Sequence, residues 1–232
     1  MGDAALDGAA AAAEAAAEPE LGPEAGPRWC CLVQHRASRF VVAHSANATE
    51  EEGAAVVVPL TRERTAGGLG IRWIADGLHA YRYWILRVYR DPERTPQGRT
   101  RKVPTPGVGL TQVVKIRKGY HIVEIKVRHC FGPEVEDPYT VRIERLNGVQ
   151  RDRLNCLTRQ THGFAKRVRT WDAIVGLALF AHNWLWEHDA LREEVAGLPG
   201  GRRYKRRTPA MAIGLSDHAW SWEELLTWRR SN

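Results

Sequence analysis

The spacing of apolar residues changes along this chain, and the change constrains the order of strands and helices more than any other feature. Two apolar runs of strand length, 28–33 and 39–44, are separated by five residues and predict adjacent antiparallel strands. Residues 50–60 begin with three acids and continue with apolar residues. This pattern is typical of a helix whose first turn complements the helix dipole. Pro59 is expected to limit the length of that helix.

The middle of the chain predicts a short buried strand at 70–75, which ends at Asp76-Gly77, and a helix at 79–89. A carboxylate is thus placed at the end of a strand. Residues 91–109 are rich in Pro, Gly, Arg and Thr and predict a loop. Alternating apolar and basic residues at 111–117 and 121–128 then predict a hairpin with one wet face, which is basic.

Two helices are expected in the last third of the chain. The first begins near Thr140, with apolar residues on one stripe and Glu144 and Arg151 together on another face. The second covers about 171–187 and is apolar nearly all round, which predicts a core element. This order of strands and helices indicates the α/β class, and periodicity alone leaves several folds of that class open.

Charge is distributed unevenly along the sequence. Residues 1–27 hold six acids and no base, whereas residues 82–128 hold twelve Lys and Arg against three acids, a net charge of +9. The first segment has little to bury, so we expect a disordered leader outside the fold. A basic stretch beside a folded core commonly neutralises phosphate. On charge alone, a surface that is merely solvated is an equally good interpretation of this basic stretch.

Cysteine spacing and hydropathy exclude some classes. Cys30, Cys31, Cys130 and Cys156 form no Cys-x-x-Cys pair, so we interpret them as reduced core residues instead of zinc ligands. No stretch approaches the roughly 20 apolar residues that a membrane helix needs. A cytoplasmic location without membrane contact is therefore expected.

Local motifs narrow the choice of family. The segment Ile143-Glu144-Arg145-Leu146-Asn147, followed by Arg151 and by residues 157–166, resembles the third-acid region of insertion-sequence DDE transposases. Ala75-Asp76-Gly77 with Tyr81 is similar to their second-acid region. The basic hairpin and residues 208–222 also resemble parts of such proteins. The resemblance covers about 29–225.

The resemblance implies a specific chemistry. In that family three carboxylates hold two divalent ions, usually magnesium, and the enzyme cleaves and joins phosphodiester bonds. By resemblance, Asp76 and Glu144 are the second and third acids and the metal ligands. The first acid is expected near the end of the first strand, before a motif like Arg-x-Ser-Arg. His35 stands there, before Arg36-Ala37-Ser38-Arg39. Imidazole is a poor magnesium ligand, so binding of Mg²⁺ or Mn²⁺ should be weakened.

The resemblance also implies an organisation and a partner. We expect a leader at 1–27, a ribonuclease-H-like catalytic domain at 28–190 with a mixed sheet, flanking helices and an inserted β-hairpin, and a basic, Trp-containing tail at 191–232. The partner is double-stranded DNA, and a homo-oligomer stays open. The cations expected to contact DNA are Lys115, Arg117, Lys118, Lys126, Arg128, Arg145, Arg151, Arg159, Lys166, Arg202, Arg203, Lys205, Arg206 and Arg207.

The expected function is therefore DNA transposition by phosphodiester cleavage and strand transfer, in a shortened and catalytically impaired member of the family. The alternative is a non-enzymatic nucleic-acid-binding remnant of a transposase, and His35 favours it for this chain. A third hypothesis is a ribonuclease-H-like nuclease unrelated to transposition. The transposase-like residues 208–222 argue against that hypothesis.

Overall fold

The computed structural model describes residues 29–47, 49–67, 69–157 and 168–228, so the expected leader at 1–27 lies outside the described residues. These residues form a mixed α/β arrangement in which β3 and β6 pair in parallel and the other strand pairs are antiparallel. The strands are β1 (Trp29–Gln34), β2 (Val41–Asn47), β3 (Arg72–Ala75), β4 (Arg90–Arg94), β5 (Thr100–Pro104), β6 (Gly109–Lys118), β7 (His121–Phe131), β8 (His188–Glu194) and β9 (Tyr204–Arg207). The helices are α2 (Glu50–Arg64), α3 (His79–Val88), α4 (Val141–Arg153), α5 (Val168–Trp184), α6 (Pro209–Ala212) and α7 (Trp222–Thr227).

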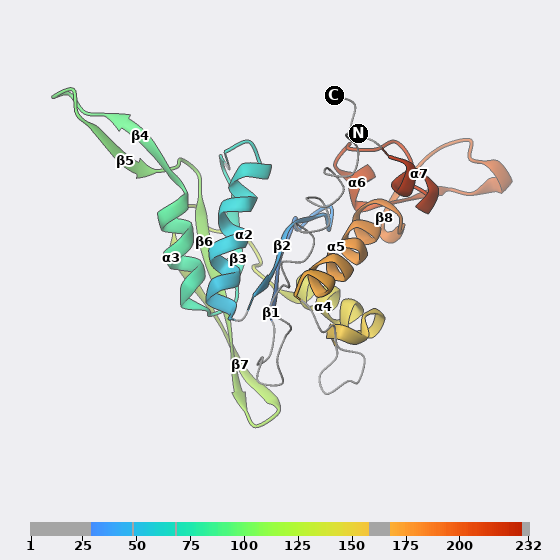
Figure 1. Cartoon of the computed structure of the whole chain (residues 1–232), viewed down its shortest axis with the longest axis horizontal. Helices are drawn as coiled ribbons and strands as arrows, with labels where there is room; N and C mark the ends of the chain where they lie inside the picture. Colours follow the sequence, from blue (N-terminus) through green and yellow to red (C-terminus); the bar gives the residue numbers. More distant parts are fainter. Residues whose placement is uncertain (1–28, 48, 68, 158–167, 229–232) are drawn as a thin grey trace, which may run out of the picture.

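The predicted α/β class is confirmed, but the strands do not join into one sheet. Within the described residues they form a three-stranded sheet, in the order β3-β6-β7, and three two-stranded sheets. Figure 1 shows α2 and α3 on one side of β1 and β2, with α4 and α5 on the other side. The centre of the molecule therefore has three layers, helices, strands and helices.

Helix α2 begins at a capping box and lies close against β1. The Thr49 hydroxyl accepts the backbone N–H of Glu52 at 3.1 Å, and the Glu52 carboxylate accepts the N–H of Thr49 at 3.3 Å. A Cβ atom built on Gly53 would lie 2.2 Å from the sulfur of Cys31. Only glycine therefore lets the first turn of the helix approach the strand so closely.

The prediction that Pro59 limits this helix was wrong, because α2 continues to Arg64. Proline removes one backbone donor inside a helix and disfavours its continuation. Here Val57 and Val58 are fully buried, and the Thr61 hydroxyl donates to the Val57 carbonyl at 2.7 Å. The packing of these residues stabilises the helix beyond the proline.

The other face of β1 and β2 packs on α5 and α4. A core cluster on this side consists of Val41, Leu146, Trp171, Val175 and Leu179. A side-chain amide links α5 to β2. Asn183 of α5 accepts the N–H of Val41 at 2.8 Å and donates to the Val41 carbonyl at 2.9 Å. Helix α5 was predicted to be apolar all round and buried, but Ile174 and Leu177 are exposed.

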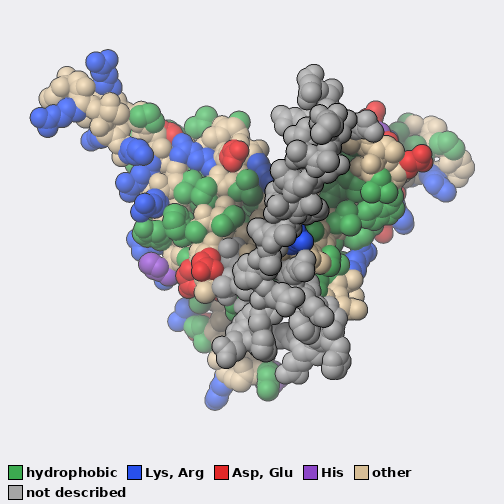
Figure 2. All heavy atoms as spheres, in the orientation of Figure 1, with side chains coloured by type: hydrophobic (Ala, Val, Ile, Leu, Met, Phe, Trp, Pro, Cys, Tyr) green, Lys and Arg blue, Asp and Glu red, His purple; other side chains and the backbone are tan. Residues whose placement is uncertain are grey.

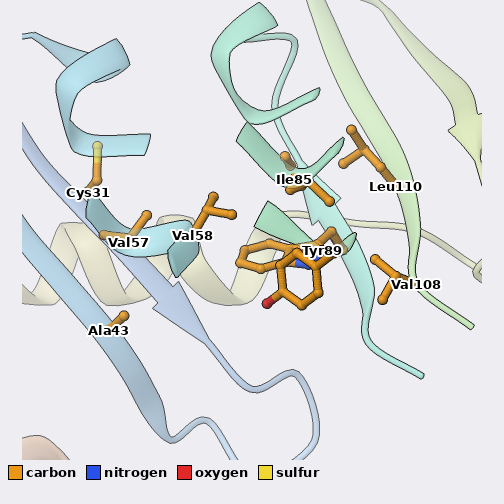
Figure 3. Packing of buried hydrophobic residues seen from close by; sticks show 10 residues of the cluster. Cys31, Ala43, Val57, Val58, Ile85, Tyr89, Val108 and Leu110 are labelled. Carbon is orange, nitrogen blue, oxygen red and sulfur yellow. The ribbon is translucent and has the colours of Figure 1, made fainter. Parts of the chain in front are cut away.

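The larger core cluster joins the two central sheets. Figure 3 shows Val57 and Val58 of α2 beside Ile85 and Tyr89, with Leu110 of β6 beyond them. The valines, Ile85 and Leu110 are fully buried. Each such side chain contributes about 2 kcal/mol relative to an exposed one. The helices α2 and α3 are therefore held against strands of both sheets by one apolar cluster.

The loop predicted at 91–109 was wrong. Residues 90–104 form the antiparallel hairpin β4–β5, in which Arg90 lies opposite Pro104 and Arg94 opposite Thr100. Figure 1 shows this hairpin as an arm that leaves the body beyond α3. Its Pro and Gly residues indicated a loop, but Pro92 and Pro104 lie on strands of a two-stranded sheet, which contains only edge strands.

The segment after α5 is structured. Strand β8 pairs with β9, so the boundary expected between residues 190 and 191 falls inside β8. Trp220 packs on Phe180 and Trp184 of α5, with ring centroids 6.0 and 5.0 Å away. The predicted basic tail is thus partly a hairpin and partly a segment packed on α5. Among the described residues, no helix has the length and apolar character to span a bilayer.

Candidate carboxylate site and basic surfaces

Asp76 lies where the sequence predicted a carboxylate, directly after β3. Its side chain is exposed, and Oδ1 accepts the backbone N–H of Leu78 at 3.1 Å. This bond closes the local turn in which an aspartate side chain commonly accepts the backbone N–H two residues further on. Asp76 therefore has a structural role at the start of α3, while its second carboxylate oxygen keeps its lone pairs for another ligand.

Glu144 lies in the first turn of α4, as predicted. Its Oε1 accepts hydrogen bonds from the ammonium group of Lys115 and from the Thr140 hydroxyl. Partial burial would raise the pKa of Glu144, but these two hydrogen bonds and the charges of Lys115 and Arg117 hold its pKa below the usual value. Glu144 is thus an ionised carboxylate that already has a cationic partner.

Asp76 and Glu144 are each linked to β6, Asp76 through the pairing of β3 and Glu144 through Lys115. The last residue of β3 lies opposite Gln112, so the next step along the chain places Asp76 beside Val113. Side chains alternate between the two faces of a strand, so Val113 and Lys115 share one face of β6. Lys115 makes the ion pair with Glu144. Glu144 is therefore joined to β6 through Lys115, whereas Asp76 directly follows β3, the parallel neighbour of β6.

A further acid lies near Asp76 and was not predicted as a site residue. Burial raises the pKa of Glu50, and the neighbouring charges of Asp76 and Glu51 raise it further. Glu50 begins α2, and its backbone carbonyl accepts the thiol of Cys31 at 3.8 Å. In the sequence Glu50 is one of three consecutive helix-starting acids, so no signal distinguished it from its neighbours.

His35 lies in the turn that joins β1 to β2, and its side chain is exposed. Its Nδ1 is 2.7 Å from the Ser38 hydroxyl oxygen. Burial raises the pKa of Cys31, four residues before His35, and the charge of Asp76 contributes to that rise. Four extended residues span about 13 Å. His35 thus lies four residues beyond Cys31, past the end of β1.

The described residues do not form the ligand set of a two-metal site. No three of their His, Cys, Asp and Glu side chains come together in a way that could hold a metal ion. His35, Asp76 and Glu144 are therefore not brought together as one ligand set. Asp76 and Glu144 supply hard oxygen ligands, which suit magnesium. The ammonium group of Lys115 takes up part of that negative charge, so a divalent ion would have to compete with it.

The predicted hairpin 111–128 is confirmed as β6–β7, but both faces of β7 are exposed instead of one. Arg117 and Lys118 are exposed near the turn. Of the other predicted cations in this hairpin, Lys126 is 3.6 Å from Glu124 and Arg128 donates to the side chain of Gln112. Tyr120 at the turn is 97% exposed. The outer half of the hairpin is thus a basic ribbon with apolar side chains between its charges.

The remaining predicted cations lie in different surroundings. Arg145 and Arg151 are exposed on α4, while Arg159 and Lys166 lie outside the described residues. In the β8–β9 hairpin, acids of β8 pair with three predicted cations, at 2.8 Å for Arg203–Glu194, 2.7 Å for Arg206–Asp189 and 3.1 Å for Arg207–Glu193. Arg202 and Lys205 are exposed in the same hairpin.

Comparison with models of protein families, with curated proteins and with solved structures found no match to this chain.

Proposed function

We propose that this protein binds double-stranded DNA through a transposase-type, ribonuclease-H-like domain and does not catalyse strand transfer as the chain stands. The observation that carries the proposal is the exposed basic ribbon of β6–β7, which continues from the same strand whose Lys115 neutralises Glu144. A cationic ribbon that extends from a carboxylate-bearing end can hold a phosphate backbone near that end.

The arrangement of the layers supports the ribonuclease-H-like part of the proposal. Helices α2 and α3 lie on one face of the central strands and α4 on the other. One carboxylate follows a strand and the other projects from the late helix α4. This is the placement that the resemblance to DDE transposases implies for their second and third acids.

The absence of strand transfer follows from charge. Two divalent ions bring four positive charges, and three carboxylates are needed around them in the family. Asp76 and Glu144 offer two, and Lys115 offsets one of these. His35 adds no negative charge. The residues present therefore do not fit a two-metal centre, and we derive no catalytic step through one.

The proposal is tested by binding of the full chain to short fluorescent DNA duplexes of unrelated sequence, measured by anisotropy over a range of salt concentrations. We expect similar affinities for all sequences and a slope of log affinity against log salt of about −0.9 for each phosphate contacted. Supercoiled plasmid should stay intact in magnesium and in manganese. Affinity that is indifferent to salt would overturn the proposal.

The second candidate is a catalytic transposase that still binds metal at His35, the position that the resemblance gives to the first acid. His35→Asp distinguishes it, because a third carboxylate at a true ligand position should tighten manganese binding in calorimetric titration. Ala37→Asp, in the same exposed turn, serves as the matched control. If the chain nicks plasmid as written, or if only His35→Asp gains metal affinity, the catalytic candidate is favoured.

A further inference from the structure

The β4–β5 arm is an exposed element that is fastened to the body only at its base. Tyr89 and Thr105 flank the two strands and are buried at 2% and 3% exposure. The Thr105 N–H donates to the Tyr89 carbonyl at 3.0 Å. Arg62 of α2 pairs with Asp91 at 2.5 Å and lies over the Tyr89 ring. From residue 92 to residue 102, every residue except Thr95 is exposed.

An isolated two-stranded hairpin is marginally stable in water, and this one contributes little to either core cluster. Its turn is nevertheless ordered by local bonds. The Thr95 N–H donates to the Arg99 carbonyl at 2.8 Å, and the Gly98 N–H donates to the Thr95 carbonyl at 2.9 Å. The arm is therefore an ordered projection, and burial in the core does not account for it.

The two faces of the arm differ in charge. Opposite residues in an antiparallel pair share a face, so Arg90, Arg94 and Lys102 lie on one face with Pro92, Thr100 and Pro104. That face carries no acid. The other face carries Asp91 and Glu93, which pair with Arg62 and Arg101. The arm thus separates a purely cationic face from a face whose charges are compensated.

Three cations of the arm have no partner among the described residues. Arg94 and Lys102 on the cationic face, and Arg99 in the turn, make no ion pair and no side-chain hydrogen bond there. Figure 2 shows Lys and Arg side chains at the end of the arm and further ones below it, over α3. These charges are exposed to water and are not paired with acids of the described residues. They are therefore available to an external polyanion.

We propose that the β4–β5 arm is a second DNA-contacting element, whose cationic face binds the phosphate backbone of duplex DNA outside the segment held by β6–β7. The inference rests on the proposed function and extends it to residues that the sequence placed in a loop. Arg94, Arg99 and Lys102 contact phosphates, which provides affinity without sequence preference. The face spans about 13 Å from Arg90 to Arg94, at roughly 3.3 Å per residue.

The test compares two triple variants of the full chain that lose the same charge. The first is Arg94→Gln, Arg99→Gln and Lys102→Gln in the arm. The second is Arg203→Gln, Arg206→Gln and Arg207→Gln in β8–β9, where acids already pair with each arginine. The sequence predicted DNA contacts for these three arginines, but the proposed function does not use them. Circular dichroism and urea unfolding establish that both variants fold. Anisotropy against salt then gives the slope for each.

We expect the arm variant to reduce the steepness of the salt dependence by about 2 to 3, at about 0.9 per phosphate contact, while the β8–β9 variant changes it by less than about 1. Equal slopes for the arm variant and the unaltered chain would overturn the inference and leave the proposed function intact. Failure of the unaltered chain to bind duplex DNA at low salt would overturn both.

Discussion

Two hairpins of this protein are rich in arginine and lysine, but they differ in what surrounds those charges. The β4–β5 arm carries Arg90, Arg94, Arg99, Arg101 and Lys102, and only Arg101 pairs with an acid of the arm. The β8–β9 hairpin carries six cations, and three of them pair with Asp189, Glu193 and Glu194. A count of Lys and Arg in the sequence therefore does not measure the charge available to a partner.

The two hairpins also differ in how they are attached to the body. The arm is held at its base by Arg62 and Tyr89. Strand β8 instead follows α5, and the rings of His182 and His188 join them at 4.8 Å. The chain after β9 returns to α5 through Trp220. We infer that the β8–β9 side is built chiefly for attachment and the arm side chiefly for contact with a partner.

The largest expected effect tests the attached side. Trp184→Ala removes a ring that stacks on Phe180 at 5.7 Å and contacts Trp220 at 5.0 Å. Loss of this packing should lower the free energy of unfolding by about 3 kcal/mol, measured by urea denaturation. Trp228→Ala, at a residue that is 61% exposed, is the control and should change it by less than about 0.5 kcal/mol. Equal effects would contradict the attachment of the C-terminal segment to α5.

The next effect concerns pH at the junction of α5 and β8. Burial lowers the pKa of His182 from 6.5 to about 4, and burial also lowers the pKa of His188. The unfolded chain therefore binds more protons than the folded chain between these values, so stability is present above about pH 6.5 and is lost as pH falls. We expect unfolding free energy at pH 5 to be about 2 kcal/mol below that at pH 7.

His182→Gln provides the control for this pH effect. The variant removes the titrating ring and keeps a donor for the Arg39 carbonyl, which His182 Nε2 contacts at 3.0 Å. Its unfolding free energy should vary with pH less than half as much as that of the unaltered chain. A variant with the unaltered pH dependence would locate the effect elsewhere.

Much of the central fold was predictable because its signals are local. The strands β1, β2 and β3, the helix α3 and the hairpin β6–β7 follow from apolar periodicity that packing does not override. The arm was missed because its strands bury almost nothing, so no apolar alternation marks them. Strand β8, whose sequence is His-Asp-Ala-Leu-Arg-Glu-Glu, was missed for the same reason. A strand that pairs through its backbone and buries almost no side chains leaves no trace in side-chain hydropathy.

The candidate site was predictable in part. A carboxylate after β3 and another on α4 could be placed from element ends and helix periodicity, because both positions depend on local structure. Glu144 was expected beside Arg151, but its hydrogen-bond partner on another element is Lys115. That contact depends on how α4 packs against β6. Pairings across elements of this kind are set by tertiary packing, which the spacing of residues does not record.

A smaller effect tests the lysine that binds Glu144. Lys115→Met removes the ammonium group that binds Glu144, so a divalent ion no longer has to compete with it. We expect manganese affinity to rise about tenfold, which corresponds to about 1.4 kcal/mol, in calorimetric titration. Lys118→Met removes the same charge at an exposed position beyond that contact and should leave the affinity nearly unchanged. Equal gains would attribute the effect to net charge instead of to the contact with Glu144.

The smallest effect tests whether pairing alone separates the two hairpins. Asp189→Asn, Glu193→Gln and Glu194→Gln together release Arg206, Arg207 and Arg203 from their acids, while exposed ion pairs of this kind contribute only about 0 to 1 kcal/mol each to stability. The fold should therefore persist, as urea unfolding would verify. The released arginines become available to phosphate, so DNA affinity at low salt should rise about threefold and its salt dependence should steepen by about 1. A triple variant whose DNA affinity and salt slope equal those of the unaltered chain would mean that position on the molecule, and not neutralisation by acids, keeps β8–β9 from DNA. The arm would then differ from β8–β9 by where it projects and not by whether its cations are paired with acids.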